Sequence, residues 1–110
     1  MSNLTAEASE LIARLRWGQP ALTIVDLRDR PTYNHHRITG AISIPLGNLT
    51  ERAKSSIHQD RQIYVYGEND MHATQGANIL ESAGFRNVGI ISGGLPAWKT
   101  FGGPTEGFKP

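Results

Sequence analysis

Two carboxylates and an imidazole stand close together near the middle of the chain. Glu68, Asp70 and His72 alternate with other residues shortly after the apolar run 63–66. An imidazole beside carboxylates can accept and release protons, so this spacing is compatible with general acid–base chemistry. The same residues also suit a solvated loop in which Asn69 or Asp70 caps the following helix. We favour the loop interpretation and keep acid–base chemistry as the alternative.

A second polar cluster begins with two histidines, which are common metal ligands. His35, His36 and Arg37 are consecutive, and adjacent side chains diverge on a helix or a strand. The sequence contains no second cluster with the spacing of metal ligands. We therefore interpret these residues as surface polar groups and expect neither a metal site nor a cofactor. His58 lies in a connecting loop and carries no signal.

Two further segments contain residues that could belong to a site. Asp26 and Arg28 come at the end of a buried-looking run, where charges are costly unless they are paired, so they look catalytic at first. Trp98 ends the segment Gly-Gly-Leu-Pro-Ala-Trp, where a large ring most often closes the core. We expect Trp98 to pack in the core, with a ligand platform as the alternative. Tyr64 and Tyr66 are also expected to pack.

The composition excludes several classes of function. The chain has 110 residues, no cysteine and a formal net charge of +1. Without cysteine it forms no disulfide, thiolate zinc site, iron–sulfur cluster or persulfide of its own. Mixed charges without a basic run argue against nucleic acid and membrane partners, and no apolar stretch approaches the ~20 residues of a membrane span. With no secretory signal at the N-terminus, we expect a cytoplasmic protein.

Strand and helix patterns alternate around these residues. Runs of apolar and β-branched residues predict strands at 22–25, 41–44, 63–66 and 88–91. Helices are predicted at 5–17, around 31–33, at 48–55, from about 73 to a glycine cap at 84, and at 95–101. The loop with the carboxylates therefore joins a strand to a helix.

The order of these elements predicts an α/β fold. The connections suit parallel pairing, so we expect a single three-layer α/β/α domain with right-handed crossovers and a parallel sheet of four or five strands. A chain of this length forms one core. We expect that core over about 5–104 and a loose tail over 105–110.

Five segments, in order along the chain, resemble the rhodanese-like family of sulfurtransferases. They are Asp26-Leu27-Arg28, Ile38-Thr39-Gly40-Ala41, Ile44-Pro45, Ala83-Gly84-Phe85 and Gly93-Gly94-Leu95-Pro96-Ala97-Trp98. The likeness extends from about Thr5 to Pro104. It implies a parallel sheet of about five strands flanked by helices, and it leaves open whether the family's short first strand is present here.

The resemblance also assigns positions to the loop. In that family the third predicted strand delivers a cysteine that carries sulfur as a persulfide, within a six-residue loop that ends in arginine. The matching residues here are Gly67, Glu68, Asn69, Asp70, Met71 and His72. Gly67 takes the nucleophile position and His72 the arginine position. The resemblance further implies that Asp26 and Arg28 hold loops in place, and Arg37 stands where the family usually has histidine.

These observations predict a catalytically inactive rhodanese-like domain. Persulfide transfer needs a soft nucleophile, and serine, histidine or glutamate cannot replace it. We expect a protein-interaction or regulatory module that binds an unidentified protein through 67–72 and the nearby 29–37 segment, because loops at the carboxyl ends of parallel strands form the binding crevice. The alternative is a small-ligand binder, or an enzyme of unknown class, that uses Glu68, Asp70 or His72.

Overall fold

A five-stranded parallel sheet forms the centre of the molecule. Its order is β1-β6-β5-β2-β4, and the strands are β1 (Leu4–Glu7), β2 (Leu22–Asp26), β4 (Ile42–Ser43), β5 (Gln62–Tyr66) and β6 (Asn87–Ser92). The structure is a computed structural model, and residues 4–16 and 22–107 are described here. The predicted parallel α/β sheet is confirmed, with five strands.

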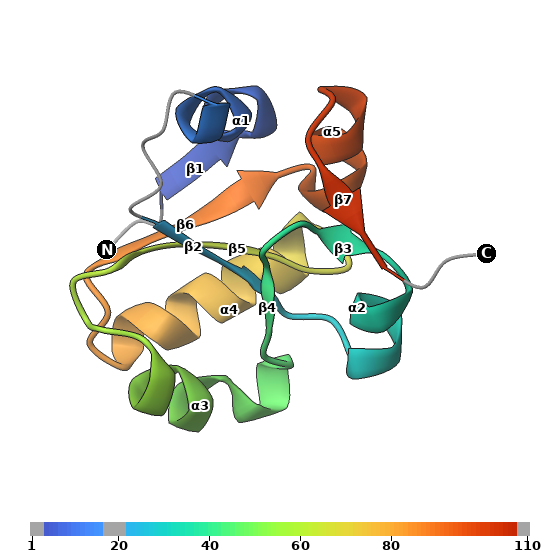
Figure 1. Ribbon diagram of the computed structural model, residues 1–110. Coiled ribbons are helices and arrows are strands. Elements are labelled where there is room, and N and C mark those ends of the chain that lie inside the picture. The colour runs from blue at the N-terminus through green and yellow to red at the C-terminus, as the bar shows by residue number, and fades with distance from the viewer. Residues whose placement is uncertain (1–3, 17–21, 108–110) are drawn as a thin grey trace.

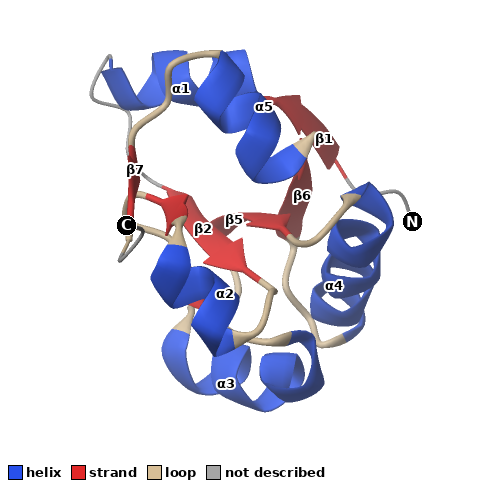
Figure 2. Ribbon diagram, turned by 90° about the vertical axis from the view of Figure 1, so that its right-hand side faces the viewer, coloured by secondary structure: helices blue, strands red, loops and turns tan. Residues whose placement is uncertain are grey.

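Helices cover both faces of this sheet, as Figures 1 and 2 show. They are α1 (Ala8–Arg16), α2 (Arg30–His35), α3 (Leu49–Ser56), α4 (Asp70–Ser82) and α5 (Gly94–Thr100), with a 3-10 turn at Leu46–Asn48 before α3. α1 and α5 pack on one face, and α3 and α4 pack on the other. In the described part of the chain, no helix combines the length and apolar character needed to cross a bilayer.

The central strands are apolar on both sides because both faces of the sheet are covered. Val25 and Val65 are fully buried beneath α3 and α4, while Tyr66 is fully buried on the opposite face. The small residues of α4 let this helix approach closely. A Cβ atom at Gly76 would overlap the side chain of Leu27, so glycine is needed at that contact.

The structure corrects the expected first helix. Residues 4–7 form β1, which pairs in parallel with β6, and α1 begins only at Ala8. The family's short first strand is therefore present. The hydrogen-bonding partners of β1 lie more than 80 residues later, so a local pattern that also fits a helix did not reveal it. The predicted helix end at residue 17 falls outside the described residues.

The second departure lies at the other end of the chain. Thr105–Glu106 forms β7, which pairs antiparallel with β3 (Arg37–Ile38) in a separate two-stranded sheet. The indole Nε1 of Trp98 donates to the carbonyl of Pro104 at 2.9 Å. We call residues 103–107 the C-terminal strap. They were expected in part as a loose tail, whereas they hold the segment after α2, and residues 108–110 lie outside the described range.

Candidate functional site

The carboxyl edge of the sheet brings the predicted site residues together. β2 and β5 are neighbours with Asp26 opposite Tyr66, so the segments that follow these two strands leave the sheet side by side. Between them and α5 lies a pocket of about 250 Å³, lined by Arg28, Gly67, Glu68, Leu95, Pro96 and Lys99. This pocket and its rim are the candidate site.

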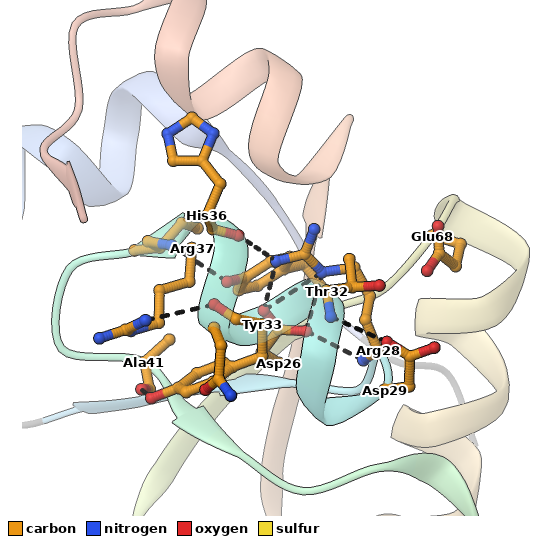
Figure 3. A network of polar contacts seen from close by, with 12 residues as sticks. Asp26, Arg28, Asp29, Thr32, Tyr33, His36, Arg37, Ala41 and Glu68 are labelled. Atoms are coloured by element: carbon orange, nitrogen blue, oxygen red, sulfur yellow. Dashed lines mark hydrogen bonds and ion pairs between the residues drawn. The ribbon is translucent and has the colours of Figure 1, made fainter. Parts of the chain in front are cut away.

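Asp26 and Arg28 form a buried ion pair beneath this pocket. The Arg28 Nη2 atom lies 2.7 Å from Asp26 Oδ2 and donates to the carbonyl of His36 at 2.6 Å (Figure 3). Burial alone would lower the pKa of Arg28, but the hydrogen bond and the charge of Asp26 outweigh it and raise the pKa. The pair therefore connects the end of β2 to the end of α2, as a structural role requires.

Tyr66 extends this buried network across the sheet. Its hydroxyl accepts a hydrogen bond from the backbone N–H of Ile38 at 3.1 Å, and the Arg28 guanidinium lies 5.4 Å from the ring centroid. Burial, and then the nearby Asp26 carboxylate, raise the pKa of Tyr66 far above its ordinary value. Asp29 caps α2 by accepting from the Thr32 N–H at 2.9 Å, which lowers the pKa of Asp29.

In the loop after β5, the His72 imidazole lies against Gly67, the residue at the nucleophile position. The Nδ1 atom of His72 accepts a hydrogen bond from the Glu68 N–H at 3.0 Å. A Cβ atom built on Gly67 would overlap this ring, with the His72 Cγ atom only 2.8 Å away. The ring therefore occupies the space into which a side chain at position 67 would project, and it fits there because glycine has no side chain.

The other loop residues divide into structural and exposed groups. Asn69 caps α4 by accepting from the His72 N–H at 2.8 Å, which realises one of the two expected caps. The Asp70 carboxylate accepts from the Gly93 N–H at 3.0 Å and so ties α4 to the turn before α5. Glu68 and Met71 project outward, with Met71 75% exposed. These two side chains are the free surface of the loop.

The remaining predicted positions serve the framework. Trp98 is fully buried, as the core interpretation expected. Arg37 forms an ion pair with Glu106 at 2.9 Å and lies 4.6 Å from the Tyr33 ring centroid, so it joins α2 to the strap. His36 approaches the Thr105 hydroxyl at 3.0 Å. Among the described residues, no three His, Asp or Glu side chains are grouped as a metal site would require.

Three pocket residues were missed by sequence reasoning. Leu95, Pro96 and Lys99 belong to α5, where only Trp98 was considered, with core packing favoured over a ligand platform. β6 lies next to β5, and this topology places the start of α5 beside the loop. The conspicuous Gly93-Gly94 pair was the available signal, because both residues have positive φ angles and turn the chain sharply at this edge.

Comparison with known proteins now assigns the family. The profile of the rhodanese-like domain matches residues 7–101. The crystal structure of the Alr3790 protein from Anabaena is similar, with a TM-score of 0.91 and 51% identity over 94% of this chain and 92% of that one. The chain therefore belongs to the rhodanese-like domain family, and it lacks the cysteine of the family's active site.

Two curated relatives show the domain in different settings. The uncharacterized protein YqhL of Bacillus subtilis is 29% identical over 98 residues, which cover 89% of this chain and 72% of YqhL. The HTH-type transcriptional regulator Rv0324 of Mycobacterium tuberculosis is 32% identical over 104 residues, which cover 93% of this chain and 44% of that protein. The chain thus spans less than half of Rv0324.

Proposed function

We propose that this protein is a non-catalytic rhodanese-like module that binds a partner protein through the carboxyl edge of its sheet. One observation carries the proposal: the His72 ring fills the space into which a side chain at position 67 would project, and it accepts a hydrogen bond from the Glu68 N–H, the amide that follows Gly67. One amide of the loop is therefore already engaged by a side chain of the same loop. The nucleophile is absent and the His72 ring fills its space, and both observations favour a binding role over a catalytic role for this loop.

The acid–base alternative receives less support from the same contacts. The Asp70 carboxylate accepts a hydrogen bond from the Gly93 N–H, and the Nδ1 atom of His72 accepts one from the Glu68 N–H. A general base needs a lone pair directed at the substrate proton, and these groups direct theirs at the backbone. Glu68 is the one of the three whose side chain points outward from the loop.

The proposed docking face combines the Glu68 carboxylate and the exposed Lys99 ammonium with apolar surface. Glu68 and Met71 stand exposed on the loop, and Leu95 and Pro96 line the adjoining pocket. A pocket of about 250 Å³ accommodates a single side chain of a partner rather than a large ligand. The occurrence of a similar domain within the longer regulator Rv0324 supports use as a module.

Affinity capture from the native cells tests this face. The combined Glu68→Gln and Met71→Ser variant should lose the captured partner while keeping the melting temperature within a few degrees, since both side chains are exposed. The control is Glu51→Gln, an exposed carboxylate on α3, which should capture normally. Asp70 is unsuitable as a probe because its loss would also release the Gly93 turn. Equal capture by all three proteins would refute the proposed face.

A sulfur-transfer assay from thiosulfate to cyanide tests the absence of catalysis. The protein should show no turnover above the protein-free reaction, because it has no thiol to carry sulfur. Gly67→Cys combined with His72→Arg should produce a measurable persulfide by mass spectrometry, whereas Gly67→Cys alone meets the imidazole and should yield much less. Appreciable turnover by the unmodified protein would overturn the proposal.

A further inference from the structure

The hydrogen bond between His72 and Glu68 depends on the protonation of the ring. The Glu68 N–H donates to Nδ1, so Nδ1 bears a lone pair and the neutral ring carries its proton on Nε2. An imidazolium has N–H groups at both positions and cannot accept. Protonation would therefore place two N–H groups opposite each other across 3.0 Å.

We propose that His72 is a proton-sensitive latch on the loop. With Nδ1 unprotonated, the ring lies over Gly67 and holds the Glu68 backbone. With the ring protonated, this bond is lost, the ring leaves the space above Gly67, and Glu68 changes its position on the docking face. The consequence for a partner rests on the proposed function, whereas the latch itself is a property of the loop.

The charged groups around the latch come from three parts of the fold. Glu68 and Asp70 are close to His72 in the sequence, on the loop and in the first turn of α4. Arg28, which follows β2, and Lys99 of α5 line the adjoining pocket together with Gly67 and Glu68. The charge of Arg28 is paired with Asp26, and Asp70 accepts from the Gly93 N–H. Among carboxylate, guanidinium, ammonium and imidazole side chains, imidazole is the one whose ordinary pKa lies between about pH 5 and about pH 8.

Two contacts hold the rest of the loop when the latch opens. Asn69 still caps α4, because its acceptor bond is to the backbone of His72 and not to the ring. Asp70 still ties α4 to the Gly93 turn. The rearrangement is therefore confined to Gly67, Glu68 and the His72 side chain, and the helix and sheet stay in place.

An NMR titration of the ¹⁵N-labelled chain tests the latch. From about pH 8 to about pH 5, the Glu68 amide should shift with the same midpoint as the His72 ring protons. His72→Gln stays neutral throughout, and its Glu68 amide should show no such step. His58→Gln is the matched control, because the Nδ1 of His58 likewise accepts from a backbone N–H, that of Asp60 at 3.1 Å. This variant should lose only the Asp60 step.

The outcomes separate the latch from the proposed function. A Glu68 amide that stays constant while His72 titrates, or a step that survives in His72→Gln, would overturn the latch. If the latch is present, partner capture by the unmodified protein should differ between about pH 7.5 and about pH 5.5, which lie on either side of the ordinary imidazole pKa. Capture by His72→Gln should be the same at both pH values. Failure of capture at every pH counts against the docking role and leaves the titration result to decide the latch.

Discussion

Gly67 and His72 share one space in the loop after β5, because a Cβ atom at position 67 would overlap the His72 ring. The ring supplies an acceptor for the Glu68 N–H, as a thiolate would, and glycine at position 67 makes room for it. Gly67 replaces the nucleophile in the sequence, and in the structure its lack of a side chain makes room for the His72 ring. An unpaired amide at this edge would otherwise have to rely on water.

A double-mutant cycle measures this coupling. Gly67→Ala should lower the free energy of unfolding by about 1–3 kcal/mol, because the new methyl group displaces the ring. His72→Ala should cost about 0.5–1.5 kcal/mol for the lost hydrogen bond. The double variant should cost less than the sum of the two, since the clash is absent once the ring is removed. Urea unfolding gives all three values.

The chain offers a matched control for this cycle. A Cβ atom on Gly47 would meet no atom within 4 Å, and the φ angle of Gly47 is not positive. Gly47→Ala should therefore change the free energy of unfolding by no more than about 0.5 kcal/mol. Strict additivity of Gly67→Ala and His72→Ala would show that the two residues do not compete for one space.

At the scale of elements, the C-terminal strap fastens β3, the short strand that follows α2. β7 pairs with β3, the Pro104 carbonyl accepts from the Trp98 indole and from the Thr39 N–H, and Glu106 pairs with Arg37. Except for the bond from Trp98, these contacts join residues far apart in the sequence, such as Arg37 and Glu106. The strap thus contributes to the position of the 29–37 segment. Among the described residues, no backbone hydrogen bond joins the strap to the loop that follows β5.

Truncation after Gly103 tests the strap. The shortened chain should lose about 1–3 kcal/mol of unfolding free energy, because the buried Trp98 N–H and the β3 backbone lose their acceptors and donors. Glu106→Gln, which removes only a half-exposed ion pair, should cost no more than about 1 kcal/mol. Thermal unfolding followed by circular dichroism measures both, and an unchanged melting temperature after truncation would contradict the role given to the strap.

At the scale of the whole molecule, one buried polar network connects the ends of β2 and β5 to the segment between α2 and β3. Asp26 ends β2, Tyr66 ends β5, and Arg28 reaches the carbonyl that precedes β3. Each charge or hydroxyl in this network has a partner, as burial requires. The network joins the carboxyl edge of the sheet to the core, so its titration should affect the stability of the entire domain.

Alkaline unfolding tests this link. Because the pKa of Tyr66 is higher in the folded state than its ordinary value of 10.0, the unfolded chain loses this proton first. The resulting stability is fully present below about pH 10 and is lost as the pH rises further. Tyr66→Phe should cost about 1–3 kcal/mol at neutral pH through the unpaired Ile38 N–H. It should also lose stability less steeply above about pH 10, and an unchanged slope would contradict this role for Tyr66.

The amino-acid sequence by itself determined the layered α/β fold, the family resemblance and the absence of thiol chemistry. Each rests on local information: apolar runs such as 63–66, the spacing of small residues in α4, and a composition without cysteine. The cap on α4 was also foreseen as Asn69 or Asp70, because capping depends on residues three positions apart.

Only the tertiary structure decided what the site residues do. β1 and β7 depend on strands more than 65 residues away, and the link from Asp70 to Gly93 crosses from one helix to the next. The overlap between His72 and a side chain at position 67 depends on the rotamer of the ring in the folded loop. Such contacts depend on how segments pack in the folded chain, so local sequence patterns do not predict them.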